Sequence, residues 1–227
     1  MNIIGIEKSS FIDYPSNICT VIFTGGCNFR CPYCHNTSIV NNIGDKIEED
    51  EVISFLKKRK KFVDALCISG GEPTLQKDLY DFICRIKEEG FLIKLDTNGT
   101  NPALLNKLID EKLIDYVAMD IKSPFAKYSS IGGTSINLED IRKSIDILLE
   151  NKVDYEFRTT ICKELLTIED IISIAKEIKG CKIYALQNFR DGETVLAGPN
   201  KFIPYQVEEL KEIEKAISTL LNKVIIR

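Results

Sequence analysis

The sequence has a single histidine, His35, among its 227 residues. One histidine excludes a Ser-His-Asp triad and any metal site built from several histidines. Asp, Glu or Lys could still act as acids and bases, but the commonest proton carrier of enzymes is almost missing. The chemistry of this chain must therefore come mainly from other residue types.

Long apolar runs and basic stripes are also missing. No stretch of about 18 apolar residues occurs, and the N-terminus has no basic region followed by an apolar one, so we expect a cytoplasmic protein without a membrane segment. The 30 Lys and Arg are spread among 34 Asp and Glu, which argues against a nucleic-acid partner. Eight cysteines without a secretion signal are expected to be reduced thiols or metal ligands.

Strand-like apolar runs alternate with stretches of helical period along almost the whole chain. Strands are expected at 18–24, 65–69, 92–95, 116–120, 155–160 and 183–188, and helices at 48–60, 76–89, 102–111, 138–150, 167–178 and 205–222. Parallel strands need crossovers of this length, so six such units predict an α/β fold with a parallel sheet. We expect one domain, a partial TIM barrel of the form (β/α)6 with an open mouth.

Three cysteines lie together in the loop at 25–36, directly after the first predicted strand. Cys27, Cys31 and Cys34 have the spacing C-x3-C-x2-C, with no fourth cysteine nearby. A cubane iron-sulfur cluster normally binds each of its four irons to a protein thiolate when it only transfers electrons. Three thiolates would leave one iron free to bind a reactant.

Glycines and polar residues follow the other predicted strands, at the carboxyl ends where parallel sheets form their active sites. They are Ser69-Gly70-Gly71-Glu72-Pro73 after the second strand, Asp96-Thr97-Asn98-Gly99 after the third, Asp120-Ile121-Lys122 at the fourth, and Arg158 and Gln187 late in the fifth and sixth. We expect these segments to converge on one mouth.

The cysteine spacing, the aromatic Tyr33 before the last cysteine and the Gly-Gly-Glu-Pro run at 70–73 together resemble the radical S-adenosylmethionine (SAM) superfamily. The resemblance implies one radical SAM domain over residues 1–227. It also implies a single [4Fe-4S] cluster, held by Cys27, Cys31 and Cys34, whose free iron binds SAM. In that superfamily, an electron from the cluster cleaves SAM to methionine and a 5′-deoxyadenosyl radical.

A SAM site at the mouth is the next implication of the resemblance. Gly70 and Gly71, which lack Cβ atoms, would let backbone groups approach the methionine amino group. Two carboxylates facing that of SAM would repel it unless a monovalent cation bound Asp96 and Asp120, or a basic side chain supplied the charge. The full expected set of SAM contacts is Tyr33, Cys34, His35, Gly70, Gly71, Glu72, Asp96, Thr97, Asp120, Ile121, Lys122, Arg158 and Gln187, with Lys122 or Arg158 as the basic side chain.

Within the superfamily, the chain resembles the glycyl radical enzyme activases, particularly those of anaerobic ribonucleoside-triphosphate reductase. The matching segments are 11–15, 34–36, 95–99 and 119–122. The resemblance implies abstraction of a Cα hydrogen from a glycine of a partner enzyme, with flavodoxin or ferredoxin as electron donor. The Asp-Tyr-Pro-Gly of that family ends in Ser16 here, which leaves in question a turn that relies on positive φ at glycine.

Other interpretations stay open. Three cysteines and His35 could bind zinc, but His35 directly follows Cys34, and adjacent residues rarely both bind one tetrahedral ion. The glycine pair could be an ordinary turn, and Asp96 and Asp120 could simply cap the segments that follow. The remaining cysteines are expected to be buried thiols: Cys19, Cys67, Cys84, Cys162 and Cys181.

Three functions compete with activation of the reductase. One is activation of pyruvate formate-lyase or another glycyl radical enzyme. Another is small-molecule radical SAM chemistry, such as that of 7-carboxy-7-deazaguanine synthase. The last is a non-enzymatic metal-binding or electron-transfer module.

Overall fold

A computed structural model describes residues 1–132 and 136–227, and its eight strands form one sheet in the order β1 to β8. The strands are β1 (Ile3–Ser10), β2 (Cys19–Thr24), β3 (Ala65–Gly70), β4 (Leu92–Thr97), β5 (Tyr116–Asp120), β6 (Asp154–Ile161), β7 (Tyr184–Asn188) and β8 (Val224–Ile226). Only β1 runs antiparallel to its neighbour, and the six later strand pairs are parallel.

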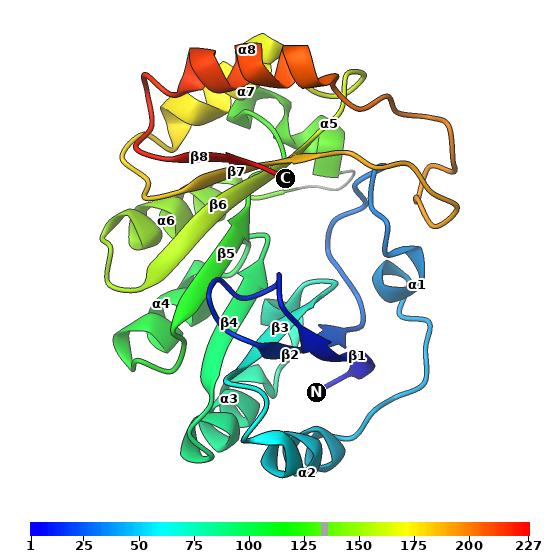
Figure 1. Ribbon diagram of the computed structural model, residues 1–227, viewed down its shortest axis with the longest axis vertical. Coiled ribbons are helices and arrows are strands. Elements are labelled where there is room, and N and C mark those ends of the chain that lie inside the picture. Colours follow the sequence, from blue (N-terminus) through cyan, green and yellow to red (C-terminus); the bar gives the residue numbers. More distant parts are fainter. Residues whose placement is uncertain (133–135) are drawn as a thin grey trace.

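Long helices connect the parallel strands and lie along the outer side of the curved sheet (Figure 1). They are α2 (Glu49–Arg59), α3 (Leu79–Glu88), α4 (Pro102–Asp110), α6 (Leu138–Leu149), α7 (Ile168–Glu177) and α8 (Val207–Ile217). Shorter pieces are α1 (Thr37–Val40), α5 (Tyr128–Gly132) and the 3₁₀ turns η1 (Pro73–Leu75) and η2 (Phe125–Lys127). None of the helices in the described ranges is long and apolar enough to cross a membrane.

The six predicted strands and six predicted helices are all confirmed, with ends displaced by a few residues. The expected open, parallel (β/α)6 core is therefore present, and two edge strands extend it. The helix predicted to reach residue 222 ends at Ile217, because the chain then turns into β8. Neither β1 nor β8 was predicted: β8 has only three residues, and β1 mixes polar residues into a short apolar run.

Alternate residues of each parallel strand face opposite sides of the sheet. In β4, Ile93 and Leu95 pack in the large core that the helices cover, whereas Lys94 and Asp96 line the inner side. The lower part of this inner side is filled by a small apolar cluster that includes Cys19, Cys67, Tyr14 and Tyr116. This alternation is what directs charged side chains of the strands into the concave side of the sheet.

All eight cysteines are free thiols. Four of the five that lie outside the cysteine loop are buried, as expected: Cys19, Cys67, Cys162 and Cys181. The expectation is wrong for Cys84, which is only half-buried on α3.

The segment between β1 and β2 keeps the turn that the loss of glycine had left in question. Ser16 has φ of 61°, and the N–H of Asn17 donates to the carbonyl of Tyr14 at 3.3 Å. Proline at the second position and positive φ at the third are typical of a type II turn. Ser16 therefore takes the left-handed conformation that glycine adopts more easily.

Ser16→Gly is expected to stabilise the protein slightly. Relief of left-handed strain outweighs the extra chain entropy of glycine in the unfolded state, for a net gain of up to about 1 kcal/mol in the free energy of unfolding. Denaturant unfolding of the two proteins measures the difference. Ser16→Ala is the control, because alanine retains the strain; an equal gain in that variant would contradict the explanation.

Candidate functional site

A cavity of about 990 Å³ lies at the carboxyl ends of the parallel strands. Of the predicted site residues, twelve SAM contacts and the remaining cluster ligands line it: Cys27, Cys31, Tyr33, Cys34, His35, Gly70, Gly71, Glu72, Asp96, Thr97, Asp120, Lys122, Arg158 and Gln187. Ile121 does not line it. Ile121 directly follows the end of β5, and its side chain lies in the core, whereas that of the preceding Asp120 faces the cavity.

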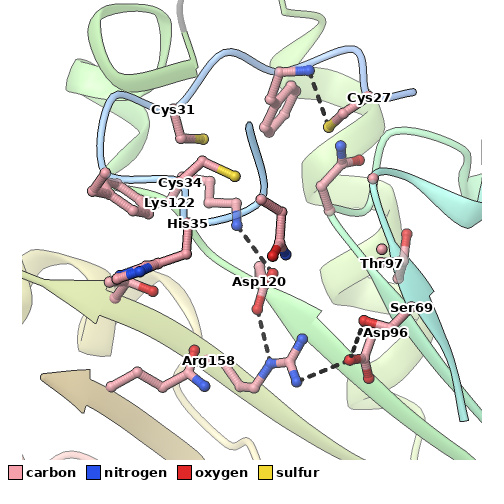
Figure 2. A pocket seen from close by; sticks show the side chains of 18 of the residues that line it. Cys27, Cys31, Cys34, His35, Ser69, Asp96, Thr97, Asp120, Lys122 and Arg158 are labelled. Carbon is pink, nitrogen blue, oxygen red and sulfur yellow. Dashed lines mark hydrogen bonds and ion pairs between the residues drawn. The ribbon is translucent and has the colours of Figure 1, made fainter. Parts of the chain in front are cut away.

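The three loop cysteines line the same side of this cavity (Figure 2). The N–H of Phe29 donates to the Cys27 sulfur at 3.3 Å, and the N–H of Cys34 donates to the carbonyl of Cys31 at 3.0 Å. Burial raises the pKa of Cys27 to about 11 and also raises that of Cys31. These thiols therefore keep their protons until a metal displaces them.

The structure gives no support for a zinc site with three cysteines and His35. Within residues 1–132 and 136–227, no group of three or more His, Cys, Asp and Glu side chains is gathered closely enough to hold a metal ion, and this applies to the three cysteines alone as well as to the set that adds His35. His35 is exposed, and its ring lies against that of Phe189, with the centroids 5.4 Å apart. The ring of the single histidine therefore packs against an aromatic side chain that also lines the cavity.

Gly70 and Gly71 pack against the backbone of the cysteine loop and of β2. A Cβ on Gly71 would lie 1.9 Å from the Gly26 carbonyl oxygen, and one on Gly70 would lie 2.4 Å from the Thr24 nitrogen. Gly70 also has φ of 113°. Protein backbone therefore occupies the position that a side chain would take at each glycine. The expectation that these glycines admit the methionine amino group stays a prediction.

Glu72 is fully buried, and its carboxylate is hydrogen-bonded to neighbouring protein groups. Its carboxylate accepts hydrogen bonds from the N–H of Thr74 at 3.0 Å, the Thr97 hydroxyl at 2.8 Å and the N–H of Asn98 at 2.6 Å. Burial raises its pKa, although these donors oppose the shift. Glu72 and Thr97 thus join the loops after β3 and β4, and the Thr97 hydroxyl is directed to Glu72.

An ion network forms the floor of the cavity (Figure 2). The Nε of Arg158 donates to Asp120 at 2.8 Å, and its Nη1 donates to Asp96 at 3.3 Å. Lys122 donates to the second oxygen of Asp120 at 3.0 Å, and Lys94 donates to Asp96. Basic side chains therefore pair with both carboxylates, and the expected monovalent cation stays a prediction.

The network keeps both carboxylates ionised. Burial alone would raise the pKa of Asp120, but Arg158 and Lys122 outweigh it and lower the pKa to about 2. Arg158 and Lys94 likewise lower the pKa of Asp96 against the effect of burial. The floor of the cavity is charged at any physiological pH.

Sequence reasoning missed several residues that line the cavity. Lys94, Glu156 and Arg227 are the clearest, and the Arg227 guanidinium binds the buried Glu156 carboxylate at 2.9 and 2.7 Å. The signal in the sequence was a charged residue between two apolar or aromatic residues of a strand, as at Lys94 and Glu156. Charged side chains are rarely buried unless they are paired. The Ile12–Pro15 segment also reaches the cavity from between β1 and β2, through Ile12, Asp13 and Pro15.

The sequence pattern that defines the Radical SAM superfamily matches residues 21–178. The chain belongs to the radical SAM superfamily. The match includes the cysteine loop and the strands β3 to β6 that position the ion network. Membership implies a [4Fe-4S] cluster and SAM as cofactors.

Three proteins illustrate the likeness. A Methanocaldococcus jannaschii protein, provisionally named a glycyl-radical enzyme activating enzyme, is 41% identical over 98% of this chain and 94% of its own length. The 7-carboxy-7-deazaguanine synthase of Thermoplasma acidophilum is 29% identical over 59% of this chain and 62% of its own. A domain of a pyruvate-formate lyase-activating enzyme from Bacteroides vulgatus has the same fold, with a TM-score of 0.57 and 18% identity over 72% of this chain and 98% of that one.

The residues of the cavity fit a radical SAM cofactor pair. Three cysteines without a fourth thiolate are the donor set of a cluster with one open iron. The Tyr33 hydroxyl is buried, lines the cavity and has no hydrogen-bond partner in the part of the chain that the structure describes. Cys27, Cys31 and Cys34 would hold the cluster, and the ion network beneath them offers charged groups to an amino acid moiety.

Gly71→Ala is expected to disturb the cysteine loop. The added methyl group would overlap the Gly26 carbonyl, and such overpacking typically costs about 1–3 kcal/mol in the free energy of unfolding. Denaturant unfolding and the iron content after anaerobic reconstitution measure the effect. Gly192→Ala is the matched control, because nothing lies within 4 Å of a Cβ at that position; equal losses in both variants would refute the role assigned to the Gly71 contact.

Asp120→Asn is expected to change how stability depends on pH. The Asp120 pKa is lowered from 3.8 to about 2, so its ion pairs stabilise the fold above the unfolded pKa and are lost as the pH falls. The difference in unfolding free energy between wild type and variant should therefore narrow by about 2 kcal/mol from pH 5 to pH 2. Urea unfolding of the cluster-free proteins across this range tests it, and parallel curves would contradict the assignment.

Proposed function

We propose that this chain activates a glycyl radical enzyme by abstracting a Cα hydrogen from one glycine of that partner. The main support is the 41% identity to a protein named for this activity, which extends over nearly the full length of both chains. Membership in a superfamily of enzymes leaves the non-enzymatic metal-binding interpretation without support. The proposal is therefore one of catalysis on another protein.

Each part of the cavity has a role in the proposed reaction. When bound, the reduced cluster and SAM supply reductive cleavage of the C5′–S bond and a carbon-centred acceptor for the glycine hydrogen. Cys27, Cys31 and Cys34 would hold the cluster, and Tyr33 lines the same cavity. Arg158 and Lys122 carry the positive charge that a methionine carboxylate needs.

A protein loop must reach the cavity from outside, and two segments between strands contribute to the lining of the cavity. The Ile12–Pro15 segment borders one side, and Arg190 and Asp191, which follow β7, also line the cavity. Phe11 and Ile12 are 74% and 88% exposed. Large apolar side chains at the entrance of a charged cavity favour a macromolecular substrate.

The partner that we propose is anaerobic ribonucleoside-triphosphate reductase, with flavodoxin or ferredoxin as the electron donor in the cytoplasm. The support is the resemblance of segments 11–15, 34–36, 95–99 and 119–122 to the activases of this reductase. Pyruvate formate-lyase is the alternative protein substrate, because it presents a glycine loop to the same chemistry.

A second candidate function is small-molecule radical chemistry of the 7-carboxy-7-deazaguanine synthase kind. It is favoured by the 29% identity to that synthase over 59% of this chain. We rank this function below activation of a protein, because the match to the synthase covers 59% of this chain and the match to the activating enzyme covers 98%.

Anaerobic reconstitution, followed by dithionite and SAM, is expected to yield 5′-deoxyadenosine. Addition of the reductase should give the doublet of a glycyl radical in electron paramagnetic resonance. Cys31→Ala removes one of three cluster ligands and is expected to abolish both signals, while a Cys84→Ala control keeps them because Cys84 lies on α3, away from the cavity.

The outcomes separate the candidate functions. A doublet with pyruvate formate-lyase but not with the reductase would change the partner. SAM cleavage without a doublet in any glycyl radical enzyme would favour the small-molecule alternative, and full activity of Cys31→Ala would refute the ligand assignment.

A further inference from the structure

The two carboxylates at the floor of the cavity have a basic partner at every oxygen. In Asp96, one oxygen accepts from Lys94, and the other accepts from Arg158 at 3.3 Å and from the Ser69 hydroxyl at 2.9 Å. In Asp120, one oxygen accepts from Arg158 at 2.8 Å and the other from Lys122 at 3.0 Å. A cation that needed these oxygens as ligands would have to displace a basic side chain.

The charge balance points in the same direction. Two carboxylates, Asp96 and Asp120, contact three cationic side chains, Lys94, Lys122 and Arg158, which leaves a net charge of +1. Glu156 on β6 and Arg227, which directly follows β8, neutralise each other. The other charged residues that line the cavity are Asp13, Glu72, Arg190 and Asp191, and none of them has an ion pair with the network in the part of the chain that the structure describes. Additional positive charge would be repelled at short range, whereas one carboxylate would make the group neutral.

Lys94 is the unusual member of this group. Its side chain is 2% exposed, and it lies two residues before Asp96 on the same face of β4. Its ammonium has Asp96 as its ion-pair partner and the Cys67 sulfur 3.8 Å away. An ammonium is a compact point charge, so in size and charge it is the side chain closest to an alkali-metal ion.

We propose that the Lys94 ammonium replaces a monovalent cation at Asp96, so that this chain binds SAM without an alkali-metal ion. The proposal rests on the SAM site assigned above. It resolves the choice between a bound cation and a basic side chain in favour of the side chain. It also adds Lys94, a positioning residue that acts through Asp96, to the residues on which SAM binding depends.

The first test uses the reconstituted wild-type holoenzyme. The dissociation constant for SAM is measured anaerobically by calorimetry in potassium chloride, sodium chloride and choline chloride at equal ionic strength. Choline is too large to enter a site built for an alkali ion. The three constants are expected to agree within about twofold, because exposed charges are screened equally at equal ionic strength.

Two substitutions at the same position then distinguish charge from shape. Lys94→Ala leaves space next to Asp96 that an alkali ion can occupy, so SAM should bind at least about tenfold more tightly in potassium than in choline chloride. Lys94→Met fills that space with an apolar chain, and its affinity should be weak in all three salts. Lys127→Ala is the control, because Lys127 pairs with Asp170 at 2.7 Å, and neither residue lines the cavity.

Two results would overturn the proposal. One is a wild-type affinity that falls about tenfold or more in choline chloride. The other is a folded Lys94→Ala variant whose affinity is the same in all three salts; if that variant does not fold, the wild-type comparison decides alone. SAM binding needs no partner enzyme, so a missing glycyl radical with salt-independent SAM binding would refute the activase proposal and leave this one standing.

Discussion

Arg158 connects the carboxylates of two neighbouring strands, and the floor of the cavity depends on that connection. A buried carboxylate is costly unless a paired charge and good hydrogen bonds replace its hydration. The guanidinium provides both, because its planar fork reaches Asp120 through one nitrogen and Asp96 through another. The ends of β4, β5 and β6 are thereby held together at the point where the cofactor would bind.

The cysteine loop is positioned from two sides, and neither contact involves a cysteine side chain. On one side, Gly71 lies so close to Gly26 that only a residue without a Cβ fits. On the other, the N–H groups of Leu196 and Ala197 donate to the carbonyls of Cys34 and Pro32 at 2.8 and 3.0 Å. Cluster ligands on a loop need such support, because loops are otherwise more mobile than the strands they follow.

The periodicity of apolar residues and the spacing of the cysteines were sufficient to predict the parallel core, the cysteine loop and the edge of the sheet where the cavity lies. They succeeded because a βα unit has few ways to fold and parallel strands end at one edge. Close backbone contacts between distant segments, and the partners of buried charged side chains, could not be predicted from the sequence. No local pattern shows that Gly71 meets Gly26, that Glu72 binds Thr97, or that β8 carries Arg227 to Glu156, since each joins segments far apart in sequence.

A built-in ammonium and a bound alkali ion solve the same electrostatic problem at different cost. The folded chain bears the desolvation of Lys94 whether or not SAM is present, but the charge is always in place and keeps a fixed position beside Asp96. A bound ion loses its hydration on each binding event, and its occupancy depends on salt. With Lys94 in the strand, the two carboxylates and three basic side chains of the ion network carry a net charge of +1, which a carboxylate of SAM bound as proposed would neutralise.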